Sequence, residues 1–300
     1  MLSKNTSELN WKKVSDGTSS AYFSSRAHSQ KIYLKKIEAR KKEANPITIF
    51  LFHDLTSYHG RFLNLTSWFQ VQHPEVSFIM MDFLGHGLSS GTRGHVSRFS
   101  DLVDDAADVF DLIEKKPGEV WIALGHGIGA LTILDLLNRF DGPIKEKIDR
   151  IILSNFFLNF PSTLLQLQNK IFENFLGIAK ALQTSRPVEI YLPGEVLSDP
   201  HEQASYLEDP LIVRRPSYET LKVVSQKVKG IHQDSYFLDK PTLLLKSGSP
   251  YLLERAMESF GKGLKKGLLT EKNYLNLKHD LYNERENTLV FNDIIEWVQS

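Results

Sequence analysis

Apolar residues along this chain follow two regular patterns. Short, continuous apolar runs are typical of strands buried on both faces of a sheet. Apolar residues that recur every three or four positions are typical of helices that pack on one side. The runs predict strands at residues 21–23, 31–37, 47–52, 76–81, 119–124, 151–154, 242–245 and 273–277. The helical spacing predicts helices at residues 61–71, 101–114, 128–140, 252–260 and 287–298.

From residue 47 onwards, strands and helices follow one another in turn, which indicates an α/β fold with a mostly parallel, doubly wound sheet. The alternation stops after Asn155 and resumes near residue 236. The segment between them has proline-marked loops and helical spacing, including a long amphipathic stretch at 164–182. We therefore expect a core formed by residues 1–155 and 236–300, with residues 156–235 as a helical cap inserted into it.

The composition is that of a globular protein and excludes several kinds of functional site. The chain has 300 residues, of which 41% are hydrophobic and 24% charged, which is typical of a globular protein. It contains 36 Lys and Arg and 36 Asp and Glu, so its formal net charge is zero. Because nucleic-acid binders usually carry a basic excess, we expect no nucleic-acid partner. The chain has no cysteine, which excludes disulfides, thiolate metal sites and cysteine nucleophiles.

The sequence carries no sign of a membrane or export segment. The first residues, MLSKNTSELNWKKVSDG, lack the apolar region of a secretory signal. No run of 18 uncharged apolar residues occurs, so no transmembrane helix is expected. We expect a soluble, cytoplasmic protein.

Polar and glycine residues follow the predicted strands at the ends where parallel sheets bind ligands. The third strand of the alternating series runs into the sequence GHGIGA at residues 125–130, which is the frame of a strand–turn–helix nucleophile elbow. His53 and Asp54 follow the first of these strands, and His279 follows the last. The second is followed by the sequence DFLGHGLSSGTRGH at residues 82–95.

These motifs resemble those of the α/β-hydrolase family, in particular its monoacylglycerol lipase and lysophospholipase group (serine aminopeptidase S33-like). Residues 82–95 match that group's pattern D-x-x-G-H-G-x-S-x-G-x-R-G-H. Residues 198–200 and 206–211 match its cap. The resemblance implies the α/β-hydrolase fold with a helical cap, and a serine, a histidine and a carboxylate as catalytic side chains.

The chain departs from that pattern at two of the three catalytic positions. The family's elbow serine is Gly127 here, and glycine has no side chain with which to attack an ester. The position of the family's acid is Pro250, or Ser249 if the loop is shifted by one residue, and neither is a carboxylate. The family's histidine is retained as His279. The sequence therefore predicts that serine-hydrolase chemistry is lost.

The resemblance also implies a backbone site that does not depend on these side chains. In the family, two main-chain N–H groups bind the oxyanion, and they correspond to Leu55 and Ile128 here. Because main-chain donors and a helix N-terminus remain when side chains change, we expect that a small acyl or ester ligand can still bind. His279 is then either a general base for water beside Gly127, or a residue that only packs.

Several histidines near strand ends raise the question of a metal site. His53, His86, His95 and His126 each fall on a motif position that the resemblance explains without metal, and the sequence shows no facing pair of carboxylates. We therefore expect no metal and no cofactor.

Three functions remain compatible with the sequence. The first, which we favour, is an inactive hydrolase fold that binds a small acyl or ester ligand between cap and sheet. The second is a weak or altered carboxylic ester hydrolase that uses His279 and the amides of Leu55 and Ile128. The third is an interaction or scaffold protein, whose protein partners the sequence does not name. Peripheral contact of the cap with lipid is compatible with the first two.

Overall fold

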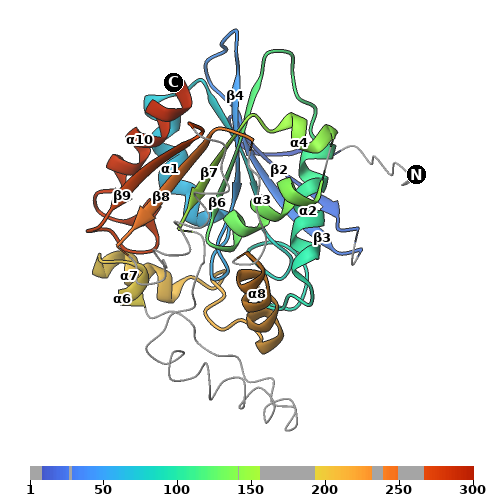
Figure 1. Cartoon of the computed structure of the whole chain (residues 1–300), viewed down its shortest axis with the longest axis vertical. Helices are drawn as coiled ribbons and strands as arrows, with labels where there is room; N and C mark the ends of the chain where they lie inside the picture. Colours follow the sequence, from blue (N-terminus) through green and yellow to red (C-terminus); the bar gives the residue numbers. More distant parts are fainter. Residues whose placement is uncertain (1–8, 27–28, 141, 156–192, 232–238, 249–266) are drawn as a thin grey trace.

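In the computed structural model, the described residues are 9–26, 29–140, 142–155, 193–231, 239–248 and 267–300. They contain a nine-stranded sheet in the order β1-β2-β3-β5-β4-β6-β7-β8-β9 (Figure 1). The first three strands join the sheet antiparallel, and the strands from β5 to β9 are parallel. The strands are β1 Lys12–Ser15, β2 Thr18–Ser24, β3 Lys31–Ile37, β4 Ile47–Phe52, β5 Val76–Met81, β6 Val120–His126, β7 Arg150–Ser154, β8 Thr242–Ser247 and β9 Leu269–Tyr274.

Helices cover both faces of the sheet, so the predicted α/β fold is confirmed. In Figure 1, α1 and α10 lie on one side of the sheet and α2 and α3 on the other, while α6 and α7 lie side by side at its lower end and α8 lies apart from them below α2 and α3. The helices are α1 Leu63–Gln72, α2 Phe99–Leu112, α3 Ile128–Arg139, α4 Pro143–Lys147, α6 Pro193–Val196, α7 Pro200–Glu208, α8 Tyr218–Ile231 and α10 Asn287–Gln299. Two short 3₁₀ helices are η1 His59–Phe62 and η2 Leu281–Asn283.

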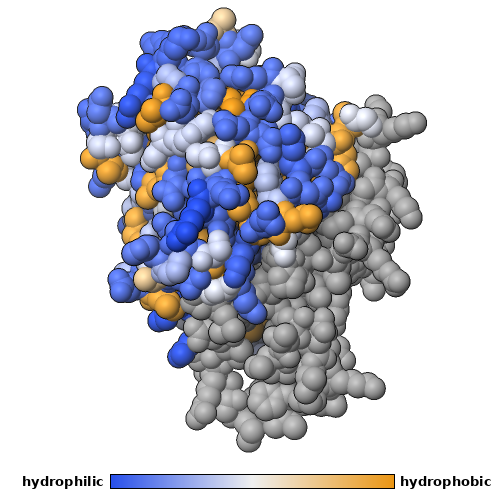
Figure 2. All heavy atoms as spheres, turned by 90° about the vertical axis from the view of Figure 1, so that its left-hand side faces the viewer, coloured by the Kyte–Doolittle hydropathy of each residue, from blue (hydrophilic) through white to orange (hydrophobic). Residues whose placement is uncertain are grey.

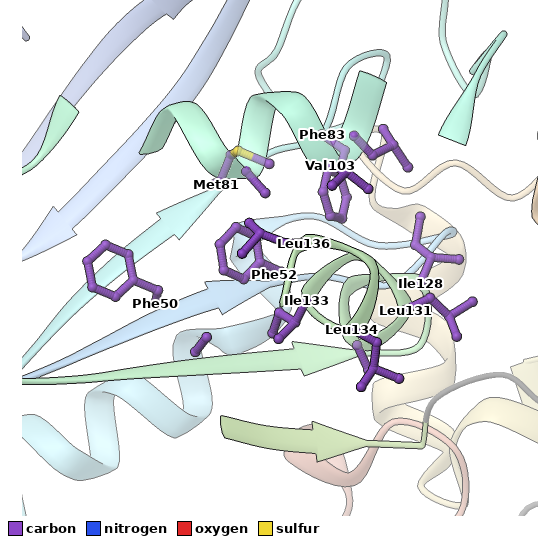
Figure 3. Packing of buried hydrophobic residues seen from close by; sticks show 14 of the residues in the cluster. Phe50, Phe52, Met81, Phe83, Val103, Ile128, Leu131, Ile133, Leu134 and Leu136 are labelled. Atoms are coloured by element: carbon purple, nitrogen blue, oxygen red, sulfur yellow. The ribbon is translucent and has the colours of Figure 1, made fainter. Parts of the chain in front are cut away.

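The alternation of side chains along β4 explains why this strand is apolar throughout. Phe50 and Phe52 join the hydrophobic cluster that contains α2 and α3, whereas Ile49 and Leu51 join the cluster that contains α1 and α10. Successive strand residues point to opposite faces, so a strand between two helical layers needs apolar residues at every position. Figure 3 shows Phe52 packed beside Ile133 and Leu136 of α3.

The sheet register brings the ends of β4 and β6 side by side. These strands are parallel neighbours, with Phe52 paired to Gly125. Just beyond the ends of these two strands, Asp54 lies against Gly127. The connections from β4 lead to β5 on one side and, later in the chain, to β6 on the other. Ligand sites of open α/β sheets form at such a reversal of strand order.

Two strands differ most from the sequence prediction, and the bounds of the others agree with it to within three residues. The last strand lies at Leu269–Tyr274, not at 273–277, and β1 was not predicted. Both are edge strands of the sheet, and most of their side chains are exposed. Edge strands therefore lack the apolar run that marks the central strands. The predicted helices at 164–182 and 252–260 lie outside the described residues.

Helices α6, α7 and α8 lie between β7 and β8 in the chain, within the predicted cap of residues 156–235. Part of the 82–95 motif fastens them to the core. The Arg93 guanidinium donates to the carbonyl oxygens of Gly87 and Leu211, at 2.8 Å each. The Thr220 hydroxyl donates to the carbonyl oxygen of Gly94 at 2.8 Å. The boundaries of core and cap stay a prediction.

In the described part of the chain, none of the helices is both long and apolar enough to cross a membrane.

Candidate active site

Gly127 forms the sharp turn between β6 and α3. Its φ of 54° and ψ of −116° lie outside the region that side-chain-bearing residues favour. Such a conformation costs a non-glycine residue about 1–3 kcal/mol, and glycine avoids most of this cost. Two residues later, Gly129 lets the first turn of α3 approach the strand, because a Cβ there would overlap the carbonyl oxygen of Phe52. The sequence GHGIGA therefore forms the predicted elbow.

The carboxylate of Asp54 fills the space in front of this elbow. A Cβ built on Gly127 would overlap both Oδ1 and the carboxyl carbon of Asp54. A serine at position 127 and an aspartate at position 54 would therefore collide. The resemblance implies a glycine at the position of Asp54, just as it implies a serine at the position of Gly127.

Asp54 is held in this place by the residues that the resemblance assigns to catalysis. Its Oδ1 accepts a hydrogen bond from the backbone N–H of Ile128 at 3.0 Å, and its Oδ2 lies 3.0 Å from Nε2 of His279. Burial alone would raise the pKa of Asp54, but the hydrogen bond and charge of His279 outweigh burial and lower it, helped by the backbone N–H of Leu55. Asp54 is therefore an internal anion that contacts both predicted oxyanion donors.

His279 reaches the site from the loop between β9 and η2. Asn155, at the end of β7, donates from Nδ2 to the backbone oxygen of His279 at 2.7 Å. The side-chain oxygen of Asn155 accepts the N–H of Ser247, at the end of β8, at 2.8 Å. Asn155 has a φ of 41°, a conformation that asparagine tolerates better than most residues. One side chain thus ties two strand ends to the histidine loop.

His126 completes the group of polar side chains at this edge. Its ring centroid lies 4.8 Å from that of His279, and its Nδ1 lies 3.1 Å from the hydroxyl of Ser154. Burial lowers the pKa of His126 to about 4, and the nearby charge of His279 acts in the same direction. His126 is therefore a neutral imidazole at physiological pH.

Other polar residues of the motifs form structural contacts. His53 lies between two backbone groups: its Nδ1 is 2.7 Å from the carbonyl oxygen of Asp54, and its Nε2 accepts the N–H of Phe83 at 3.0 Å. The hydroxyl of Ser89 donates to the carbonyl oxygen of Asp82 at 2.6 Å. His86 lies 2.8 Å from the carbonyl oxygen of Leu55.

His95 is another motif residue with a structural contact, since its Nδ1 lies 2.9 Å from the hydroxyl of Ser217 in the cap. Pro250 and Ser249, the predicted positions of the missing acid, lie outside the described residues. The assignments of Gly127, Pro250, Leu55, Ile128 and His279 to catalytic positions therefore stay predictions, with the geometry given above.

A family model described as Serine aminopeptidase, S33 matches residues 44–286, which is well over half of the chain. The chain belongs to this family. The resemblance to the monoacylglycerol lipase and lysophospholipase group of α/β-hydrolases is thereby confirmed.

Relatives of the S33 chain include enzymes that act on lipids. It is 25% identical over 257 residues to Phospholipase YtpA of Bacillus subtilis, covering 83% of this chain and 94% of the relative. It is 23% identical over 266 residues to the Monoacylglycerol lipase of Mycolicibacterium smegmatis, covering 84% and 88%. It is also 25% identical over 248 residues to the uncharacterized protein YnbC of Escherichia coli, covering 81% of this chain and about two fifths (40%) of YnbC.

Solved structures agree with the fold. The crystal structure of Paleococcus ferrophilus monoacylglycerol lipase matches with a TM-score of 0.69 at 20% identity, covering 89% of this chain and 97% of the other. A soluble variant of monoglyceride lipase from Saccharomyces cerevisiae, in complex with a substrate analog, matches with a TM-score of 0.75 at 17% identity, covering 97% and 94%. At this identity the likeness shows the fold alone.

Sequence reasoning missed the two residues that organise this site, Asp54 and Asn155. The signal for Asp54 was present, because a charged side chain stands where the family has glycine, in the same chain that has glycine where the family has serine. Taken together, the two departures place a side chain at position 54 and remove one from position 127. Asn155 marked only the end of the strand–helix alternation, and its partners lie 92 and 124 residues further along the chain.

Proposed function

We propose that this S33 chain is a non-catalytic member of its family, which acts by binding and not by ester turnover. The observation that supports this proposal is the position of Asp54. Its carboxylate stands where the nucleophile of a serine hydrolase would stand, and the described elbow offers no hydroxyl in its place.

The same carboxylate disfavours the transition state of ester hydrolysis. Oxyanion-hole donors accelerate acyl transfer because they are free to bind the developing negative charge, and losing one donor costs about 10²–10³-fold in rate. Here the N–H of Ile128 already donates to Asp54. A second anion at this spot would also be repelled by the Asp54 carboxylate.

This arrangement restricts the ligand that we expect. A small ester or fatty acid between cap and sheet would have to be held by apolar contacts, because the amides of Leu55 and Ile128 already face an internal anion. The scaffold role has no large apolar patch to support it on the visible face of the described residues. There, apolar side chains are scattered among polar ones (Figure 2).

The proposal is tested by hydrolysis and by covalent labelling. Purified full-length protein is assayed with a short-chain p-nitrophenyl ester and with a monoacylglycerol, in the presence of a chelator, and is treated with a fluorophosphonate probe. The monoacylglycerol lipase of M. smegmatis serves as the active control. We expect the buffer rate and no labelling. Turnover above the buffer rate that disappears in His279→Ala would overturn the proposal.

A second candidate is a hydrolase of altered mechanism, and the close pair of Asp54 and His279 is the observation that favours it. A carboxylate beside an imidazole is an arrangement that can activate water. In that case both Asp54→Asn and His279→Ala lower the rate of ester hydrolysis, and the fluorophosphonate probe still fails to label the protein. Equal rates for all three proteins exclude this candidate.

A further inference from the structure

Three side chains from distant parts of the chain meet at the carboxyl edge of the sheet. Asp54 follows β4, His126 ends β6 and His279 lies in the loop after β9. One carboxylate oxygen and one nitrogen from each imidazole all lie within 4.8 Å of one another, and all three residues are buried. One carboxylate and two imidazoles are a common ligand set for divalent transition metals, as in the His₂Glu zinc sites of metalloenzymes.

Neighbouring groups hold two of the ligands in position. The hydroxyl of Ser154 binds Nδ1 of His126, which leaves the other ring nitrogen as the ligand atom. The N–H of Ile128 binds Oδ1 of Asp54, which leaves Oδ2 on the side of His279. Metal-binding imidazoles almost always have such a partner on their second nitrogen.

We propose that Asp54, His126 and His279 form a binding site for a divalent transition-metal ion such as Zn²⁺. Ligand atoms on one zinc ion lie about 2.0–2.2 Å from it and therefore about 3–4 Å from one another. The pair Asp54 Oδ2 and His279 Nε2, at 3.0 Å, already has this spacing. The ion replaces the proton shared by Asp54 and His279.

The role of His126 distinguishes a metal site from a simple ion pair between Asp54 and His279. A buried carboxylate paired with an imidazole needs only Asp54 and His279. A metal site needs the third ligand as well. Replacing His126 therefore leaves the ion pair in place but removes metal binding.

The experiment uses the full chain after treatment with a chelator. Binding of Zn²⁺ is measured by equilibrium dialysis with elemental analysis, and Co²⁺ serves as a spectroscopic probe of coordination. We expect one ion per chain. His126→Gln and His279→Gln should each weaken binding by more than about 100-fold, and Ser154→Ala, which changes only a neighbour of the ligand, by about 10–100-fold.

His201→Gln is the matched control, because this histidine is exposed on α7 and lies outside the proposed site. It should bind Zn²⁺ like the parent protein. Circular dichroism confirms that each variant is folded, and Ser154→Ala keeps the test valid if His126→Gln does not fold. Absence of stoichiometric binding, or binding that His126→Gln and Ser154→Ala leave unchanged, would overturn the proposal.

The metal site does not rest on the proposed loss of ester turnover. Metal binding is read by dialysis and by the Co²⁺ spectrum, whereas loss of turnover is read by hydrolysis and labelling in the presence of a chelator. Either proposal therefore stands or fails without the other.

Discussion

At the scale of single residues, the space at the end of the sheet between Gly127 and Asp54 has room for only one side chain. The side chain of Asp54 occupies the space that a Cβ on Gly127 would need. Such complementary positions couple energetically, because each substitution is tolerated only with the other. A side chain at position 127 therefore requires a change at position 54 as well.

Gly127→Ser is expected to lower the free energy of unfolding by about 2–6 kcal/mol. The positive φ contributes about 1–3 kcal/mol, and overpacking against Asp54 contributes a similar amount. Urea denaturation measures the loss. Gly127→Ala, which has the Cβ but no hydroxyl, should be destabilised to a similar extent and serves as the control.

The double variant Asp54→Gly/Gly127→Ser removes the overlap. We expect it to lose about 1–3 kcal/mol less than the sum of the two single variants. A fluorophosphonate probe should also label it at position 127 more readily than it labels Gly127→Ser alone. If the loss of the double variant equalled the sum of the losses of the two single variants, the side chains at positions 54 and 127 would not compete for the same space.

At the scale of elements, the site is assembled from loops that hydrogen bonds and ion pairs hold together. Arg61 in η1 donates through Nη2 to Oδ2 of Asp280, next to His279, at 2.8 Å. Both side chains are almost entirely buried. Burial alone would lower the pKa of Arg61, but the charge of Asp280 outweighs it and raises the pKa. This pair joins the first part of the core to the last.

Arg61→Met is expected to destabilise the fold by about 3–5 kcal/mol, because it leaves the Asp280 carboxylate buried without its guanidinium. Thermal and urea unfolding measure the loss. The double variant Arg61→Met/Asp280→Leu should recover a large part of it, since apolar pairs often replace buried ion pairs at little cost.

An exposed ion pair provides the control for this prediction. Lys13 and Asp16 form a pair whose side chains are both open to solvent. Lys13→Ala should leave the unfolding midpoint unchanged, because such pairs are screened by water and salt. If Arg61→Met were as mild as Lys13→Ala, the buried pair would not hold the histidine loop in place.

At the scale of the whole molecule, buried histidines set the response to acid. Burial lowers the pKa of His53 to about 3 and that of His126 to about 4, below the value of about 6.5 in an unfolded chain. The folded state therefore binds fewer protons than the unfolded state in this range. Stability from these residues is complete above about pH 6.5 and is lost as pH falls towards about 4 and then 3.

We expect the urea midpoint of the chain to fall steadily from about pH 7 to about pH 4. His126→Asn, whose side chain does not titrate, should show a shallower slope than the parent protein. His201→Gln should keep the parent slope, because His201 is exposed on α7. A midpoint that does not change over this range would contradict the neutral, buried state of both histidines.

The central elements of this fold follow from the sequence, because a strand covered on both faces must be apolar at every position. Ile47–Phe52, Val76–Met81 and Lys31–Ile37 were predicted with the bounds that the structure has. The edge strand Leu269–Tyr274 was displaced by four residues at its start, since one side of an edge strand faces water and needs no apolar run.

The sequence by itself also determined the elbow glycine and the family. The assignment of His279 to a catalytic position stays a prediction. The sequence did not determine what occupies the elbow. Asp54, Gly127 and His279 are far apart in the chain, and only the parallel register of β4 and β6, with the loop after β9, brings them together. Which side chain fills a space, and which charge it faces, depends on contacts between residues that are far apart in the chain. The tertiary structure therefore decided that the Asp54 carboxylate fills the space in front of Gly127 and that His126 lies in the same group of side chains.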